Sequence, residues 1–155
     1  MHFWASDGNA YAHYTSRFRR RPAEDLQTLR DCPVFLQNLV PKALEVRATV
    51  VGGSIYAASI DTRGASDDAK VDWRYYDWAS TPYYPITLPP EVSARLISVM
   101  SSLGLVYGAF DLILTPTGEY VFLEVNSMGQ WLWVEELTDL PISDAIARWL
   151  IDPVA

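Results

Sequence analysis

Two stretches of strand-forming residues, Leu44 to Val51 and Ser54 to Asp61, are separated only by Gly52-Gly53. Two glycines between such stretches are a strong signal for a tight β-hairpin. In the first stretch polar and apolar residues alternate, so Glu45 and Arg47 share one face of the strand while the other face is apolar. The pattern predicts an antiparallel sheet with at least one apolar face.

A second pair of strands is expected from Tyr107 to Leu114 and from Tyr120 to Asn126, on either side of a turn. The other expected elements are a short helix from Pro22 to Asp31, a strand from Val34 to Val40, a long loop over 62–89, and helices from Pro90 to Leu103 and from Pro141 to Ile151. Strands joined by hairpins, with a few helices, indicate an α+β fold in which helices pack on an antiparallel sheet.

The chain has 155 residues, half of them apolar, which suffices for one domain with a hydrophobic core. Its net charge of -7 argues against a nucleic-acid partner, and no apolar run is long enough to span a membrane. Cys32 is the only cysteine, so an internal disulfide is excluded, which fits a cytoplasmic location. With only His2 and His13 beside Cys32, a zinc site built from Cys and His is also excluded.

Acidic residues lie within the second pair of strands. Asp111 interrupts an apolar strand, and Glu124 and Asn126, two residues apart, project from the same face of the next strand. If the hairpin loop has an even number of residues, Asp111 stands opposite Glu124, about 5 Å away at Cβ. If the loop consists of the three residues from Pro116 to Gly118, Asp111 pairs with Leu123 and turns away.

Two carboxylates this close repel each other unless a cation lies between them. Carboxylate and amide oxygens suit magnesium, which leaves its other positions to water and substrate phosphates. The alternative is that Asp111 caps a strand edge while Glu124 and Asn126 face water.

Arg47 and Arg74 carry fixed hydrogen-bond donors that suit phosphate or carboxylate oxygens. A magnesium site with two arginines beside it would indicate phosphoryl chemistry, in which positioning and charge neutralisation dominate. The alternatives are a weak surface pair between Glu45 and Arg47, and stacking of Arg74 on the aromatic residues of the 62–89 loop.

Several segments, taken in their order along the chain, resemble the C-terminal part of ATP-grasp ligases. The segments that carry the resemblance are Cys32 to Lys42, Leu44 to Gly52, Asp72 to Arg74, Gly108 to Leu112 and Phe122 to Trp133. The similarity is greatest to the ATP-grasp ribosomal peptide maturases, the microviridin-type ligases, and more distant to the ribosomal-protein glutamate ligases. It implies a C-terminal ATP-grasp-like subdomain over 32–151, after a poorly defined segment over 1–31 and before a tail over 152–155.

The resemblance also implies roles for individual residues. The magnesium ligands would be Asp111, Glu124 and Asn126, which requires the register that places Asp111 opposite Glu124. The nucleotide would be bound by Gln37, Asn38 and Leu39 at the adenine hinge, by Glu45 near the ribose and by Arg74 at the phosphates. The catalytic residues would be Arg74, at the phosphate and the acyl phosphate, and Arg47, which supports the same face.

The implied function is that of an ATP- and Mg²⁺-dependent ligase. A carboxylate of a ribosomal precursor peptide would attack the γ-phosphate of ATP, and an amine or hydroxyl would then displace phosphate from the acyl phosphate. ATP-grasp enzymes take a lysine and a Gly-rich loop from a first subdomain, and neither Lys42 nor Lys70 stands in that position, so a missing N-terminal half is an expected partner. Two alternatives stay open: a non-catalytic module that binds a peptide or partner, and a pseudogene product without a function.

Overall fold

The computed structural model describes residues 2–4, 10–12, 15–17, 35–75 and 79–153. The strands in these ranges are β1 (His2–Trp4), β2 (Ala10–Ala12), β3 (Leu44–Val51), β4 (Ser54–Ile60), β5 (Tyr83–Ile86), β6 (Tyr107–Leu114) and β7 (Tyr120–Asn126). The helices are α1 (Pro90–Leu103), α2 (Leu132–Thr138) and α3 (Ile142–Ile151), with a short 3-10 helix at Trp73–Tyr75. Within the described part of the chain, no helix combines the length and apolar character needed to cross a membrane.

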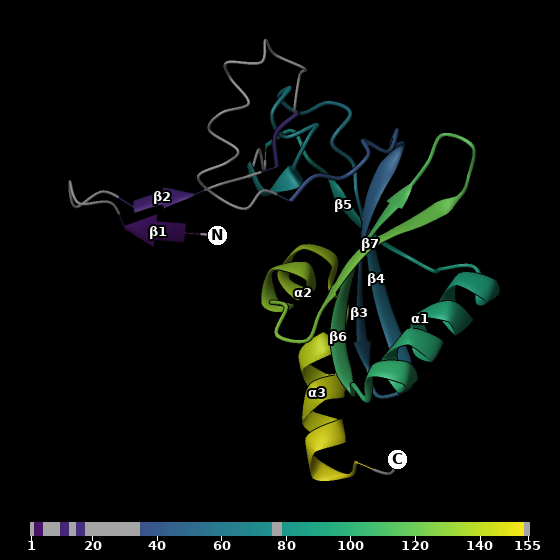
Figure 1. Cartoon of the computed structure of the whole chain (residues 1–155). Coiled ribbons are helices and arrows are strands. Elements are labelled where there is room, and N and C mark those ends of the chain that lie inside the picture. The colour runs from purple at the N-terminus through teal and green to yellow at the C-terminus, as the bar shows by residue number, and fades with distance from the viewer. Residues whose placement is uncertain (1, 5–9, 13–14, 18–34, 76–78, 154–155) are drawn as a thin grey trace.

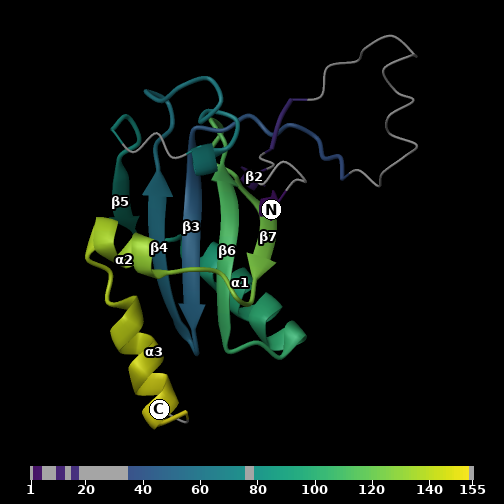
Figure 2. The same cartoon turned by 90° about the vertical axis from the view of Figure 1, so that its left-hand side faces the viewer.

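Strands β3 to β7 form an antiparallel sheet in the order β5-β4-β3-β6-β7, and β1 pairs with β2 in a separate two-stranded sheet. Helix α1 covers one face of the five-stranded sheet, and α2 and α3 lie against the other (Figure 1 and Figure 2). The predicted α+β architecture, with helices packed on an antiparallel sheet, is confirmed.

The face of the sheet under α1 is apolar because the alternation in β3 sends its apolar residues there. The buried cluster between this face and α1 contains Val46, Ala48, Val50, Phe110 and Leu112 of the strands, and Leu96 and Met100 of the helix. Each of the larger ones contributes about 1.5–3 kcal/mol of hydrophobic stabilisation. Helix α1 has a proline in its first turn and ends at Gly104, whose φ of 63° gives a left-handed cap, as the sequence predicts.

The opposite face of the sheet has an apolar part and a polar part. The apolar part includes Val51 and Ala58 and is buried under α2 and α3, which contribute Val134 and Ile142. At the other end of β3 and β6 the same face carries Glu45, Arg47 and Asp111, all buried. We call this polar part the site face.

The hairpin between β6 and β7 has the three-residue loop from Pro116 to Gly118, the second of the two alternatives. The Thr115 N–H donates to the Glu119 carbonyl (2.9 Å), and the Gly118 N–H donates to the Thr115 carbonyl (3.0 Å). Gly118 has a φ of 87°, which closes the turn in a conformation that glycine adopts without strain. With this loop alone, Asp111 would pair with Leu123.

Asp111 nevertheless pairs with Glu124, because a β-bulge corrects the register. Leu112 pairs with Phe122 and Asp111 with Glu124, so Leu123 is the extra residue between two regular pairs. The pairing of the two carboxylates that the resemblance requires is present, but it arises from the bulge and not from an even loop.

Four other expectations differ from the structure or lie outside it. No strand forms over residues 35–40, where Phe35 and Leu39 are exposed. β5 lies inside the predicted loop over 62–89, and its Pro85 is tolerated because β5 is an edge strand. Helix α2 was not expected, since it is short and no side chain caps its start. The predicted helix from Pro22 to Asp31 lies outside the described residues.

Candidate functional site

Three neighbouring strands bring Arg47, Asp111 and Glu124 into one row on the site face. Arg47 of β3 pairs in register with Asp111 of β6, which pairs in turn with Glu124 of β7. Arg47 Nη1 donates to Asp111 Oδ1 at 2.7 Å, and the side chains are only 7% and 9% exposed. This ion pair is therefore nearly excluded from water, which strengthens its attraction and makes the loss of either partner expensive.

Arg74 reaches the same carboxylates from the loop that precedes β5. Its Nη2 donates to Asp111 Oδ2 at 2.6 Å and lies 3.5 Å from Glu124 Oε1. Its Nη1 donates to Asp72 Oδ1 at 3.3 Å, and its guanidinium carbon lies 5.1 Å from the centre of the Trp73 ring. Asp111 thus accepts from one arginine at each oxygen.

The cluster of Asp72, Asp111, Glu124, Arg47 and Arg74 has three carboxylates against two guanidinium groups, which leaves one excess negative charge when all are ionised. Partial burial raises the pKa of Glu124, and the charge of Asp111 raises it further, although 59% of the Glu124 side chain is exposed. Burial also opposes the ionised form of Asp72, but hydrogen bonds from Thr15 and Arg74 outweigh it and hold the pKa of Asp72 below its usual value. The excess negative charge therefore falls on Glu124.

The donor set fits a hard divalent cation. Asp111 and Glu124 face each other across β6 and β7, and Asn126 lies two residues further along the same face. The Asn126 Oδ1 accepts from the Met128 N–H at 2.8 Å and keeps a second lone pair. Within the ranges that the structure describes, no three His, Cys, Asp or Glu side chains gather into a metal site, so an amide or other oxygen would have to complete the set.

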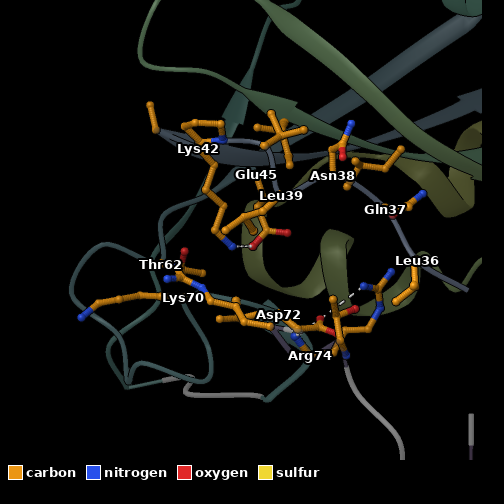
Figure 3. Close-up of a pocket in the computed structure, with 18 of the residues that line it drawn as sticks. Leu36, Gln37, Asn38, Leu39, Lys42, Glu45, Thr62, Lys70, Asp72 and Arg74 are labelled. Carbon is orange, nitrogen blue, oxygen red and sulfur yellow. Dashed lines mark hydrogen bonds and ion pairs between the residues drawn. The ribbon is translucent and has the colours of Figure 1, made fainter. Parts of the chain in front are cut away.

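A pocket of about 1060 Å³ opens beside this cluster (Figure 3). Its lining includes Gln37, Asn38, Leu39, Lys42, Glu45, Asp72, Arg74, Ile113 and Leu123. The volume is of the order that holds a ligand of drug or nucleotide size. The β-bulge therefore has a second effect, since Leu123, the extra residue, lines the pocket.

Glu45 lies in this pocket with Lys42 as its ion-pair partner, and Figure 3 shows the ammonium group directed at the carboxylate. Burial raises the pKa of Glu45, and the hydrogen bond from Lys42 partly opposes that rise. The alternative of a weak surface pair between Glu45 and Arg47 does not hold, because Glu45 pairs with Lys42 and Arg47 pairs with Asp111.

The structure brings the predicted site residues into two adjoining groups. Gln37, Asn38, Leu39 and Glu45 line the pocket, Arg47, Asp111 and Glu124 form the row on the site face, and Arg74 belongs to both groups. Asn126 lies on the predicted face of β7, but its Oδ1 accepts a hydrogen bond from the Met128 N–H in the turn that follows. Asp72 and Lys42 were not among the predicted site residues. The available signals were the closeness in sequence of Asp72 to Arg74 and of Lys42 to Glu45.

Comparison with known proteins gave matches to solved structures. No protein-family model matches the sequence, and no curated protein matches it. The macrocyclase MdnC of Microcystis aeruginosa, solved with its precursor peptide MdnA, is 34% identical with a TM-score of 0.82, over 99% of this chain and 47% of that chain. A RiPP-associated ATP-grasp ligase of Chryseobacterium gregarium, solved with ADP and a leader and core peptide, is 33% identical with a TM-score of 0.87, over 100% of this chain and 47% of that one.

The macrocyclase MdnB of Microcystis aeruginosa is 36% identical with a TM-score of 0.62, over 88% of this chain and 47% of that chain. The fold is accordingly that of the C-terminal subdomain of an ATP-grasp enzyme. More closely, the chain resembles the C-terminal part of the ATP-grasp ligases that mature ribosomal peptides, as its motifs predict. It spans about half the length of these relatives.

Proposed function

We propose that this chain is the metal-binding half, and one wall of the nucleotide pocket, of an ATP-dependent ligase that joins a carboxylate of a precursor peptide to an amine or a hydroxyl. One observation carries the proposal. Arg74 lines the pocket and also donates to Asp111, so a space large enough for a nucleotide adjoins carboxylates that suit a cation. A relative with 33% identity was solved with ADP and a peptide, which supports the same assignment.

In this proposal the nucleotide lies in the pocket. Gln37, Asn38 and Leu39 contact the adenine edge, and Glu45, oriented by Lys42, accepts a hydrogen bond from the ribose. Arg74 donates to phosphate oxygens. Such donors and acceptors in a partly closed pocket hold the triphosphate in one orientation, which is the main requirement of phosphoryl transfer.

Asp111, Glu124 and Asn126 would hold Mg²⁺, which when bound supplies charge neutralisation at the phosphates. Arg47 orients Asp111 through its hydrogen bond to Oδ1. The peptide carboxylate attacks the γ-phosphorus and ADP leaves, after which the amine or hydroxyl attacks the acyl carbon and phosphate leaves. Arg74 stabilises the negative charge on the transferred phosphoryl group and on the acyl phosphate.

Because the relatives are about twice as long, the proposal includes a partner half that covers the pocket and supplies the remaining phosphate contacts. This chain alone is then expected to bind ATP weakly with Mg²⁺ and to show no turnover. A cytoplasmic location is also part of the proposal and rests on the single Cys32.

The experiment is a calorimetric titration of ATP with and without Mg²⁺, on the wild type and on Glu124→Gln. Exposed Glu91→Gln serves as a matched control, since it removes the same charge away from the site face. We expect Mg²⁺ to strengthen ATP binding to the wild type and to Glu91→Gln, but not to Glu124→Gln. An equal effect of Mg²⁺ on ATP binding in all three proteins would contradict the assignment of the metal site. Peptide binding that persists in Asp111→Ala and Glu124→Ala, without any ATP binding, would favour the non-catalytic module instead.

A further inference from the structure

The loop between β7 and α2, residues 127–131, contacts the site face through its backbone. The Tyr107 hydroxyl donates to the Gly129 carbonyl, and Arg47 Nη2 donates to the Gln130 carbonyl at 3.2 Å. Two consecutive carbonyl groups of the loop are therefore bound by two residues of the sheet. One of these residues, Arg47, is the buried partner of Asp111.

The loop lies so close to the sheet that it requires glycine at position 129. A Cβ atom there would come within 2.4 Å of the Ala109 Cβ and 2.8 Å of Arg47 Nη2. The Ala109 Cβ is fixed to the backbone of β6 and has no freedom to withdraw. Any displacement of the loop is thus transmitted directly to the Arg47 guanidinium.

Further contacts hold the loop at both of its ends. Asn126 Oδ1 accepts from the Met128 N–H at 2.8 Å at the start. At the end, the Trp131 ring packs edge-on against Tyr107 at 5.9 Å between centres, and its Nε1 donates to the Ser143 hydroxyl of α3 at 3.0 Å. Tyr107 therefore contacts the loop twice, by its hydroxyl and by its ring.

Arg47 depends on this loop for half of its hydrogen bonds. Its Nε is buried and has no hydrogen-bond partner among the described residues, so Asp111 and the Gln130 carbonyl are the groups that hold the guanidinium. Without the Gln130 carbonyl, a single hydrogen-bonded partner would be left, and the guanidinium could rotate about it.

We propose that Tyr107 is a positioning residue, which holds the 127–131 loop so that the Gln130 carbonyl fixes Arg47 and, through Arg47, orients Asp111. The effect on the guanidinium stands independently of the ligase assignment, whereas the consequence for metal binding rests on the proposed function. Tyr107 touches neither substrate nor metal in this account and acts only through the loop.

The test is Tyr107→Phe, which removes the hydroxyl and keeps the ring. Tyr56→Phe is the matched control, because Tyr56 packs on the same apolar cluster and its hydroxyl has no hydrogen-bond partner among the described residues. The first readout is NMR of the arginine side chains. We expect exchange of the Arg47 guanidinium hydrogens to accelerate about five- to tenfold in Tyr107→Phe, the effect of losing one hydrogen bond, and to stay unchanged in Tyr56→Phe.

Ser143→Ala, which releases the Trp131 ring from α3, should shift the same Arg47 signals while leaving Tyr107 intact. The second readout is the Mg²⁺ concentration that gives half-maximal enhancement of ATP binding, expected to rise several-fold in Tyr107→Phe only.

The outcomes separate the claims. Arg47 signals that do not change in Tyr107→Phe overturn the positioning role. Changed signals with no Mg²⁺-dependent ATP binding in the wild type overturn the proposed function and leave the positioning of Arg47 standing. Changed signals with an unaltered Mg²⁺ dependence in Tyr107→Phe overturn the link between the two.

Discussion

Asp111 accepts from two arginines, and the same substitution at each should have very different effects on stability. The perturbation is Arg47→Met or Arg74→Met, which removes the charge and keeps most of the apolar side chain. The side chains are 7% exposed for Arg47 and 37% exposed for Arg74, and they contact opposite oxygens of one carboxylate. The comparison thus sets a buried partner of Asp111 against a partly exposed one.

The magnitudes follow from that difference. Removing one partner of a buried pair leaves an inadequately compensated charge, which costs about 3–5 kcal/mol. We expect Arg47→Met to lower the free energy of unfolding by about 3 kcal/mol, at the lower end of this range, because Asp111 keeps its hydrogen bond to Arg74. Removing a partly exposed arginine costs about 1 kcal/mol or less. Asp72, the other partner of Arg74, keeps the backbone N–H bonds from Thr15 and position 74.

The assay is urea denaturation followed by circular dichroism, which avoids the fluorescence of Trp73 beside Arg74. A difference of about 2 kcal/mol between the variants corresponds to roughly thirtyfold in the folding equilibrium. The double variant Arg47→Met/Asp111→Asn should be nearly as stable as Arg47→Met, because the Asp111 carboxylate that Arg47 compensates is then absent. Equal losses in the two single variants, or an Arg47→Met loss below about 1 kcal/mol, would refute the description of Arg47–Asp111 as a buried pair.

Three further predictions concern the same face of the sheet. The folded state raises the pKa of Glu124, so ionisation of this carboxyl destabilises the folded protein as pH rises from the ordinary pKa of glutamate through the raised one. Urea midpoints measured from pH 4 to 7 should therefore show Glu124→Gln gaining stability relative to the wild type at the upper end of this range. The control Glu91→Gln should show no such gain. Gly129→Ala should lose about 1–3 kcal/mol by overpacking against Ala109, whereas Gly53→Ala, with open space around it, should not; similar losses would contradict the close contact. Deletion of Leu123 removes the bulge and one wall residue of the pocket while keeping Asp111 opposite Glu124. Calorimetry should therefore show weaker nucleotide binding that still depends on Mg²⁺. Loss of the Mg²⁺ dependence would contradict the pairing of Asp111 with Glu124 in this variant.

The regular part of the fold was predictable because side-chain alternation and turn residues are local signals. The alternation in β3 correctly assigned Glu45 and Arg47 to one face, and Gly52-Gly53 correctly marked the hairpin. The register of β6 and β7 was left open by the sequence, and loop length alone would not have decided it, since the three-residue loop and the bulge at Leu123 shift it in opposite directions. A bulge places an extra residue of one strand opposite its partner strand, so it depends on how the two strands pair and not on the sequence of either strand alone.

The candidate site was predictable as a set of residue types but not as a set of partners. Asp111 and Glu124 stood out as acids in strands, yet their counter-charges come from Arg47 and Arg74, which are 64 and 37 positions from Asp111. Nor could the sequence reveal that Tyr107 binds a loop carbonyl, because that contact depends on how closely residues 127–131 approach the sheet. Such pairings are decided by tertiary packing, whereas the face that a residue occupies is decided locally.

In the proposed function, Asp111 and Glu124 hold a divalent cation at the phosphates of a nucleotide in the adjoining pocket. Anomalous diffraction from crystals of the chain grown with Mn²⁺ and ADP tests it most directly. We expect a manganese peak between the two carboxylates and in contact with ADP phosphate oxygens. ADP bound in the pocket with manganese elsewhere, or with Arg74 alone between the carboxylates, would contradict it.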